Sequence, residues 1–568
     1  MAIKMPLTDD IRFDSKEVAQ ENDSSSTLHY LMWFRRDLRL HDNTALTVLC
    51  ERANEKNAQV SAIFFCTPEQ WRAHDISLAQ VDHIARTLPL LAQNLQEQLN
   101  IPLSVYVCDN FSDCTNAIID ICRTKNIDVV MANHEYEGNE IARDEQLTKQ
   151  LAKNNIEFIR YHDQCILPPQ SITTNDGSMY QVFTPFYKKW RHTLEVGELQ
   201  IHDAHAIINH KNSALKLLTE KKSSEVSADT FEDIQELCKK VVIDYQQCLQ
   251  RHASYQYINT ESQLSHARNA YPASENAACQ RLDAFIADDI DNYDVSRDVP
   301  SLQATSQLSA YLTIGAISPR LCYLKATEAL QDFNKDNTNS FDASSENNSD
   351  NSSDNNDINR WISELAWRDF YRHVLEHKPE LIRHQAYKHE TDSKINWSYN
   401  KDDFTAWCQG KTGVPLVDAA MLCLNATGFM HNRLRMVTAM FLTKDLLIDW
   451  RLGERYFMQQ LIDGDFASNN GGWQWSASTG TDAAPYFRIM NPFSQAKSHD
   501  PDAEFIKTWL PELTDVPPTI LHSEDKMRKE LAKGGKFSKI DYPLPMVEHK
   551  AARLLAIAAF KNEPQQLL

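Results

Sequence analysis

The spacing of apolar residues changes along the 568-residue chain, and this change limits the folds available to it. Between about residues 28 and 165, short apolar runs are separated by helix-length segments such as Ala79–Leu99. The runs are Val60–Cys66, Leu103–Val107 and Asp128–Met131. Strands that alternate with helices form parallel sheets covered on both faces. The sequence therefore predicts an α/β domain over residues 28–165, with a parallel sheet and helices on both of its faces.

The second half of the chain has a helical pattern. After Tyr293 no strand pattern persists, and we expect a large all-α domain over residues 291–565. Its clearest amphipathic segments are Ser306–Thr313, Arg360–Glu376, Val417–Thr427, Asn432–Trp450 and Arg455–Leu461.

Three further regions have weaker patterns. Residues 1–27 form a polar tail, and residues 166–290 are mixed in charge with weak periodicity, as in an interdomain linker. Within that linker, the aromatic stretch Gly177–Trp190 is expected to pack against a domain rather than bind a ligand. Residues 332–358 are so rich in Asn, Ser and Asp that they predict a disordered insert.

Composition excludes several classes of protein. No window approaches the ~18 continuous apolar residues of a membrane span, and the N-terminus lacks the apolar stretch of a secretory signal, so we expect a cytoplasmic protein. The 12 cysteines include no CxxC pair, which argues against a thiolate metal site, and we expect no metal. A net charge of −20 argues against a chain that coats nucleic acid indiscriminately, but it leaves room for a local basic face.

One predicted helix in the second half carries an unusual set of side chains on one face. Glu364, Trp367, Arg368 and Tyr371 are spaced three and four residues apart. A carboxylate, two aromatic rings and an arginine on one face could stack a nucleobase and contact its polar edge. A helix that simply docks on its neighbour would show the same pattern.

Acidic, basic and aromatic residues recur in two later segments. Asn432, Arg433, Arg435 and Met436 open one apolar segment, while Asp463 and Asp465 precede Asn469, the pair Gly471–Gly472, Trp473 and Trp475. A buried arginine needs an anionic partner, so a structural ion-pair network is one interpretation. Paired acids also occur in metal hydrolases, but no third ligand or activated nucleophile accompanies them.

Several motifs together closely resemble the photolyase/cryptochrome family, and in particular the bacterial class I cyclobutane pyrimidine dimer photolyases. They are WFRRDLRLHDN (Trp33–Asn43), ATSQLS (Ala304–Ser309), WRDFYRH (Trp367–His373), HNRLRM (His431–Met436), DLLIDW (Asp445–Trp450) and NNGGWQWSASTGTDAAPYFRIMNP (Asn469–Pro492). They occur in the family's order, and the resemblance covers roughly residues 29–565 except for the Asn/Ser-rich insert and much of the linker. The resemblance implies a Rossmann-like N-terminal domain, an FAD-binding helical domain and light-dependent repair of pyrimidine dimers in DNA.

The resemblance also implies which residues bind the cofactor. FAD, active as the reduced anion, would be held by Tyr293, Thr305, Ser306, Gln307, Leu308, Ser309, Arg435, Asp463, Gly464, Asp465 and Asn469. In this interpretation Arg435 pairs with Asp463, and Asn469 faces the flavin N5 position. A light-harvesting antenna, with methenyltetrahydrofolate expected, would contact His74, Asn139 and Glu140.

The same resemblance implies a site for the lesion and a path for electrons. The flipped dimer would meet the catalytic set Glu364, Trp367, Asn432, Met436, Asn469 and Trp475, and the surrounding DNA would meet Arg297, Glu364, Trp367, Arg368, Asn432, Arg433 and Gln495. A tryptophan triad of Trp397, Trp450 and Trp473 would re-reduce the flavin, with Trp407 either in the core or an alternative exit. The expected partner is ultraviolet-damaged DNA, with no membrane and no obligate protein partner, and a monomer is expected.

Three residues depart from the family pattern. Gln307 replaces the usual arginine, Phe429 replaces the usual tryptophan, and Arg383 lies near the position of an antenna-contacting lysine. The alternative function is that of a cryptochrome, a blue-light receptor without repair activity. Asn432, Met436 and Asn469 favour repair over this alternative.

Overall fold

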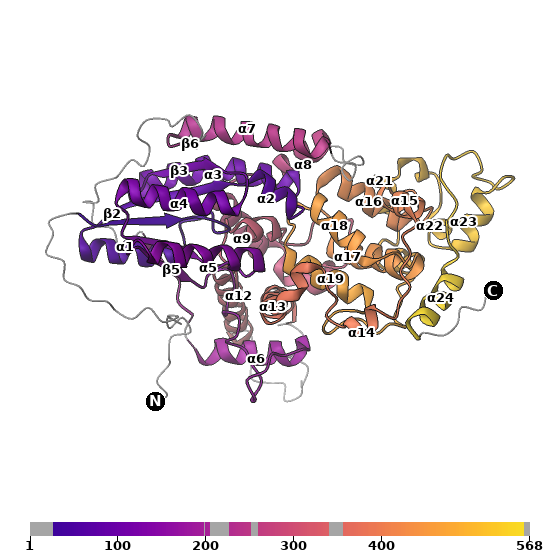
Figure 1. Ribbon diagram of the computed structural model, residues 1–568. Helices are drawn as coiled ribbons and strands as arrows, with labels where there is room; N and C mark the ends of the chain where they lie inside the picture. The colour runs from indigo at the N-terminus through magenta and orange to yellow at the C-terminus, as the bar shows by residue number, and fades with distance from the viewer. Residues whose placement is uncertain (1–26, 198, 205–226, 252–259, 340–355, 562–568) are drawn as a thin grey trace.

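The computed structural model describes residues 27–197, 199–204, 227–251, 260–339 and 356–561, with a sheet-containing part and a helical part side by side (Figure 1). The sheet has strand order β5-β4-β1-β2-β3-β6. Its strands are β1 (His29–Trp33), β2 (Gln59–Cys66), β3 (Leu103–Val107), β4 (Val129–Asn133), β5 (Glu157–Tyr161) and β6 (Ser227–Ala228). All neighbouring strands are parallel except β3 and β6.

Both faces of the sheet are covered by helices, as the sequence predicts. In β1, Tyr30 and Met32 join the core formed with α1 (Thr44–Lys56) and α3 (Leu78–Leu99). Leu31 and Trp33 point to the opposite face, where α4 (Phe111–Lys125) and α5 (Gly138–Ala152) pack. The period of two in a strand therefore divides its side chains between two cores.

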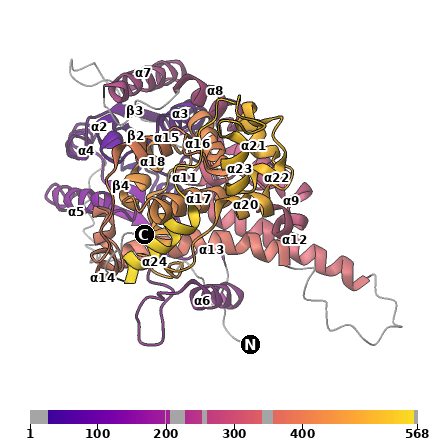
Figure 2. The ribbon, with the colours of Figure 1, turned by 90° about the vertical axis from the view of Figure 1, so that its right-hand side faces the viewer.

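Most described residues of the expected linker are helical. It contains α6 (Phe183–Val196), α7 (Phe231–Gln250), α8 (Thr260–Ala270) and α9 (Glu275–Asp288), and it supplies β6 to the sheet. The helix α7 packs along α3 through an apolar face, which the weak overall periodicity of the region conceals. In both ribbon views α6 and α7 lie at opposite ends of the molecule (Figures 1 and 2).

The helical part follows α9. Its helices are α10 (Tyr293–Ser296), α11 (Ser309–Ile314), α12 (Pro319–Asn339), α13 (Asn356–His377), α14 (His389–Asp392), α15 (Lys401–Cys408), α16 (Pro415–Thr427), α17 (Asn432–Met440), α18 (Trp450–Gln460), α19 (Phe466–Ala477), α20 (Pro492–His499), α21 (Glu504–Trp509), α22 (Pro518–Leu521), α23 (Glu524–Leu531) and α24 (His549–Lys561). The short helix α2 (Pro68–Ala73) belongs to the sheet domain, and the remaining turns are η3 (Ile290–Asn292), η4 (Pro379–Arg383), η5 (Phe441–Asp445) and η6 (Pro511–Leu513). Among the described residues, no helix is long and apolar enough to cross a membrane.

Two boundaries in this part differ from the prediction. The expected single helix Asn432–Trp450 ends at Met440, passes through the π-helical turn η5, and gives way to α18, which begins at Trp450. Asp449 caps α18 by accepting a hydrogen bond from the Arg451 amide. This N-cap starts a new helix inside an otherwise apolar stretch. The expected insert 332–358 is helical at both ends, in α12 and α13, and its centre lies outside the described residues.

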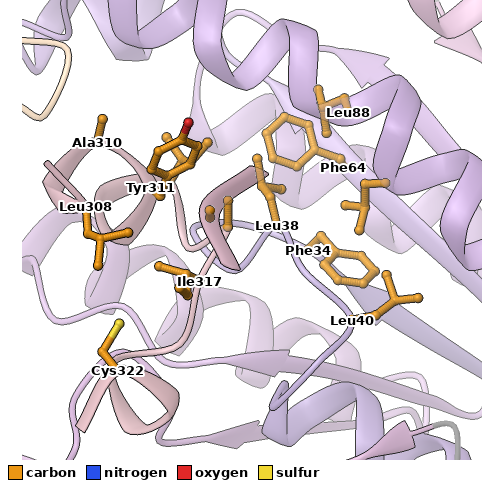
Figure 3. Close-up of a cluster of buried hydrophobic side chains, with 14 of the residues drawn as sticks. Phe34, Leu38, Leu40, Phe64, Leu88, Leu308, Ala310, Tyr311, Ile317 and Cys322 are labelled. Atoms are coloured by element: carbon orange, nitrogen blue, oxygen red, sulfur yellow. The ribbon is translucent and has the colours of Figure 1, made fainter. Parts of the chain in front are cut away.

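A continuous apolar cluster joins the two parts of the molecule. Figure 3 shows Phe34, Leu38 and Phe64 from the sheet domain beside Leu308, Tyr311 and Ile317 from the helical domain. The helical domain is thus held against the sheet domain by buried surface, as well as by the chain that connects them.

Buried ion pairs reinforce this junction. Arg320 of α12 donates from Nη2 to Asp163 Oδ1 over 2.8 Å, and from Nε to Asp42 Oδ2 over 3.0 Å. Arg39 Nη2 donates to the other Asp163 oxygen. Burial alone would raise the pKa of Asp163, but Arg39 and Arg320 hold that pKa well below its ordinary value. One guanidinium of the helical domain therefore bridges two buried carboxylates of the sheet domain.

Arg320→Met should strongly destabilise the protein, because two buried carboxylates would lose their shared cation. Breaking a buried pair from one side costs about 3–5 kcal/mol. Urea unfolding of full-length protein measures the effect. The matched control is Lys325→Met on the same helix, whose exposed pair with Asp283 is worth less than about 1 kcal/mol. Equal losses in the two variants would contradict the role given to Arg320.

Candidate functional site

The predicted polar and aromatic face of α13 contacts α10 and α6. Glu364 accepts a hydrogen bond from Arg297 Nη1 over 2.5 Å, and the Arg297 guanidinium lies 5.4 Å from the centre of the Tyr293 ring. Trp367 stacks on Phe183 of α6, with ring centres 3.7 Å apart and planes within 7°. One face of the Trp367 indole is therefore covered by the aromatic stretch of the expected linker, as its packing role predicts.

The predicted DNA-contacting arginines already have partners. Arg433 pairs with Asp298, which also lies near Arg297. Arg368 donates to the Gln164 carbonyl, and burial together with Arg372 lowers the pKa of Arg368 to about 10. Arg368 thus ties the helical domain to the sheet domain.

Arg435 and Asp463 form the predicted ion pair. Arg435 Nη2 donates to both oxygens of Asp463, over 3.0 and 2.8 Å, while its guanidinium lies 5.6 Å from the Phe429 ring centre. Phe429 therefore supports the arginine through a cation–π contact. The pair joins α17 to the turn that precedes α19.

Asp465 has a partner that the sequence did not reveal. Its Oδ2 accepts from Arg372 Nη2 over 2.6 Å, and its Oδ1 caps α19 by accepting from the Ser468 amide. Burial alone would raise the pKa of Asp465, but Arg372 and Arg368 hold that pKa well below its ordinary value. Arg372 lies in the quoted motif, but only the crossing of α13 and α19 brings it to Asp465.

The segment 305–309 leads into α11. Thr305 and Ser306 are half-buried before the helix, and their hydroxyls donate to no described residue. Gln307 has a φ of 48°, and its side-chain oxygen accepts a hydrogen bond from the Arg281 guanidinium Nη1 over 2.9 Å. Leu308 is buried in the interdomain core, which limits its contribution to a ligand to its backbone.

The helix α19 is anchored to α18 through Glu454. Asn469 Nδ2 donates to the Glu454 carbonyl over 2.9 Å, and Asn470 Nδ2 donates to the Glu454 carboxylate over the same distance. The other carboxylate oxygen lies 2.6 Å from His384 Nδ1, and this hydrogen bond raises the pKa of His384. These bonds fix the orientation of the Asn469 amide.

The two glycines of α19 have different surroundings. A Cβ at Gly471 would lie 2.2 Å from the Tyr371 ring, whereas a Cβ at Gly472 would meet no atom within 4 Å. Gly472 lies three residues after Asn469 and therefore shares its side of the helix. An open space thus adjoins Asn469 on one side of α19.

Trp473 and Trp475 occupy different environments. Trp473 is buried, with its ring centre 5.0 Å from that of Phe457 and 6.1 Å from that of Trp407. Trp475 is only half-buried, as is Met436 on the neighbouring helix α17. The two tryptophans therefore point to different neighbours.

The outer two members of the predicted tryptophan triad meet at one carboxylate. Trp397 Nε1 and Trp450 Nε1 both donate to Asp392 Oδ1, over 3.0 and 3.2 Å. Trp450 begins α18, and Trp473 packs on the same helix against Gly453. The structure thus links the three indoles through α18.

The three predicted antenna residues lie together in the sheet domain. His74 Nε2 is 2.9 Å from Asn139 Nδ2, and His74 Nδ1 is 3.4 Å from Glu140 Oε1. Burial would raise the pKa of Glu140, but the hydrogen bond to His74 lowers it to about 2. Arg383 is exposed in η4, where the adjacent Ile382 packs against Gly138.

A cavity of about 80 Å³ adjoins this cluster, between the two domains. It lies at the carboxyl ends of β1 and β2, the side on which open α/β sheets bind ligands. Three buried polar atoms of its lining have no hydrogen-bond partner among the described residues: Arg35 Nε, Gln80 Oε1 and Glu140 Oε2. No group of three or more metal-ligating side chains occurs in the described part of the chain.

Comparison with known proteins agrees with this arrangement. Residues 30–206 match the family model described as "DNA photolyase", and residues 361–562 match "FAD binding domain of DNA photolyase". The deoxyribodipyrimidine photo-lyase of Escherichia coli is 39% identical over 94% of this chain and 98% of its own length. The chain belongs to the DNA photolyase family.

Solved structures support the family fold. A bacterial class III photolyase from Agrobacterium tumefaciens has a TM-score of 0.72 and 29% identity, covering 96% of this chain and 99% of its own. The cryptochrome of Synechocystis, with a TM-score of 0.70 and 23% identity over 94% of this chain and all of its own, shares the fold.

The residues of this DNA photolyase family member fit a flavin dinucleotide. The hydroxyls of Thr305 and Ser306, which donate to no described residue, could donate hydrogen bonds to phosphate oxygens. The anchored Asn469 amide borders the open space at Gly472. The sequence did not single out Glu454, His384 or Asp392, because His384 pairs with the distant Glu454 and Asp392 with the distant Trp450. Their local sequence patterns are too common among proteins to have identified these three residues.

The two glycines of α19 provide a matched test of this geometry. Gly471→Ala should lower the free energy of unfolding by about 1–3 kcal/mol, because its methyl group overlaps the Tyr371 ring. Gly472→Ala should be neutral or stabilising by up to about 1 kcal/mol through helix propensity. Urea unfolding of the cofactor-free protein measures both.

Gly472→Ala should lower flavin retention even though it does not lower the free energy of unfolding. Gly472→Ala places a methyl group beside Asn469, so purified protein should retain less flavin although its fold is unimpaired. Full flavin content in Gly472→Ala would remove this side of α19 from the binding site.

Proposed function

We propose that this chain repairs cyclobutane pyrimidine dimers in DNA, in a light-dependent reaction that uses reduced FAD. The single observation that carries the proposal is the open side of α19, where the anchored Asn469 and Gly472 adjoin Trp473. The identity to curated deoxyribodipyrimidine photo-lyases over most of the chain supports the same function.

The helical domain would hold the FAD. The residues that would bind it are Tyr293, Thr305, Ser306, the backbone of Leu308, Ser309, Arg435, Asp463, Asp465 and Asn469, and Gln307 would support them through Arg281. When bound, reduced and excited FAD supplies the electron that splits the cyclobutane ring. The protein positions the reactants, and no general base or nucleophile is required.

The dimer would enter between α13, α17 and α19. Trp367 is supported from behind by Phe183, so its indole can act as a rigid wall, with the half-buried Trp475 and Met436 as further surfaces. Glu364 would form a hydrogen bond with the thymine edge, and its bond to Arg297 keeps its side chain in place. A damaged base step stacks poorly, which lowers the cost of flipping it out of the duplex.

DNA around the lesion would contact Arg297, Arg433, Asn432 and Gln495. Arg433 would exchange its bond to Asp298 for a phosphate, and Gln495 has a buried Oε1 without a partner among the described residues. Arg368 would not contact the DNA, because its guanidinium lies in the interdomain contact.

The antenna site would lie at the cavity beside His74. The unpaired Gln80 and Glu140 oxygens could accept hydrogen bonds from the N–H groups of a pterin ring. The cavity is far smaller than the roughly 300–1,000 Å³ of typical ligand pockets, so a methenyltetrahydrofolate would insert one ring and leave the remainder at the surface near Arg383.

Light dependence is the most direct consequence of this proposal. Reduced protein incubated with dimer-containing DNA should lower the dimer content under blue light and leave it unchanged in the dark. Chromatography of the digested DNA measures the dimers. Equal dimer content in the lit and dark samples would eliminate repair and leave a photoreceptor function to be considered.

Trp473→Phe should separate photoreduction from repair. The indole is the most easily oxidised neutral side chain, so its loss should block light-driven reduction of oxidised flavin while pre-reduced protein still repairs dimers. Absorption spectroscopy measures photoreduction, and Trp509→Phe, outside the three linked indoles, serves as the control. Normal photoreduction in Trp473→Phe would exclude Trp473 from the electron path.

A further inference from the structure

We propose that Asp392 and Arg451 direct oxidation outward along the tryptophan chain, with Asp392 as the shared hydrogen-bond acceptor of Trp397 and Trp450. This inference rests on the proposed electron-transfer role of Trp397, Trp450 and Trp473. It assigns a function to two charged residues that contact neither the proposed flavin site nor the proposed DNA contacts.

The geometry places one carboxylate oxygen between two indoles. Asp392 is the last residue of α14, and its Oδ1 accepts from Trp397 Nε1 over 3.0 Å and from Trp450 Nε1 over 3.2 Å. Only 8% of Asp392 is exposed, so water screens these contacts weakly.

An indole that loses an electron becomes a cation, and its positive charge extends to the ring N–H. A carboxylate that accepts this N–H stabilises the cation far more than the neutral ring, because the hydrogen bond becomes charge-assisted on both sides. Asp392 therefore makes both outer indoles easier to oxidise.

Arg451 distinguishes between the two indoles. Its Nη2 donates to Asp392 Oδ2 over 2.6 Å, and its guanidinium lies 4.6 Å from the centre of the Trp450 ring. The described residues place no arginine or lysine over the Trp397 ring. A cation held against Trp450 disfavours a second positive charge on that ring, so the positive charge is more stable on Trp397.

The greater exposure of Trp397 also favours the positive charge on that ring. Trp450 is fully buried, whereas 9% of Trp397 is exposed. In the step that results, one electron passes from neutral Trp397 to the Trp450 radical cation, which becomes neutral, and Trp397 becomes the radical cation. The electron that Trp450 lost earlier has gone inward to Trp473, and from there toward the oxidised flavin. No proton needs to move for the charges to balance.

Asp392→Asn tests the shared acceptor, because the amide keeps the shape of the carboxylate but removes its charge. In flavin-loaded protein with the flavin oxidised, a flash should produce a tryptophan radical whose long-lived yield falls roughly tenfold in this variant, since hydrogen bonds to charged groups contribute about that much. The matched control is Asp402→Asn, an exposed carboxylate in the first turn of α15 that contacts no indole.

A second readout does not depend on flavin. In ¹⁵N-tryptophan-labelled protein kept in the dark, the indole N–H resonances of Trp397 and Trp450 should move upfield in Asp392→Asn and stay in place in Asp402→Asn. Trp397→Phe and Trp450→Phe assign the two resonances. Unmoved resonances in Asp392→Asn would overturn the shared hydrogen bond itself.

Arg451→Leu tests the direction of transfer. In a Trp397→Phe background the positive charge stops at Trp450, and removing the guanidinium should lengthen the lifetime of that radical. An unchanged or shorter lifetime would overturn the role of Arg451. A wild-type protein that forms no tryptophan radical would instead contradict the proposed function, whereas a wild-type radical with an unaltered yield in Asp392→Asn would contradict only this inference.

Discussion

The position of α19 depends on two glycines that receive aromatic rings. Gly471 leaves room for Tyr371 of α13, and Gly453 of α18 leaves room for Trp473, so that a Cβ at either position would lie within 2.2 Å of a ring atom. Close packing of this kind allows little adjustment. It sets the angle at which α19 presents Asn469, Gly472 and Trp473, and the cofactor, lesion and electron-path assignments all depend on that angle.

The acidic charge of the chain is compatible with binding DNA at one place. Arg433, beside the proposed lesion pocket, is paired with Asp298 in the structure, so binding a phosphate there means exchanging one anion for another. Such an exchange contributes less affinity than free arginines would, and it should weaken as salt rises. Selectivity then comes mainly from the flipped base and its aromatic walls rather than from a broad basic surface.

Local sequence patterns predicted much of the secondary structure. Most of the contacts that were not predicted join residues far apart in the chain. Strands β2, β3 and β4 and helix α3 follow directly from apolar spacing, whereas β5 and β6 were not predicted. The Arg435–Asp463 pair agrees with the family resemblance. The break before α18 was missed because the apolar residues continue across it. Three missed contacts arise only where distant segments meet: Arg372 with Asp465, Arg368 with the sheet domain, and Trp450 with Asp392.

The central claim is that light absorbed by a flavin in the helical domain drives repair of the lesion. The most direct test is an action spectrum, in which the rate of dimer loss per incident photon is measured across the near-ultraviolet and blue and compared with the absorption spectrum of the same reduced protein. The account predicts that the two spectra coincide, with any antenna band present in both. Repair that proceeds equally at wavelengths where the bound flavin and antenna do not absorb, or in darkness, would contradict it.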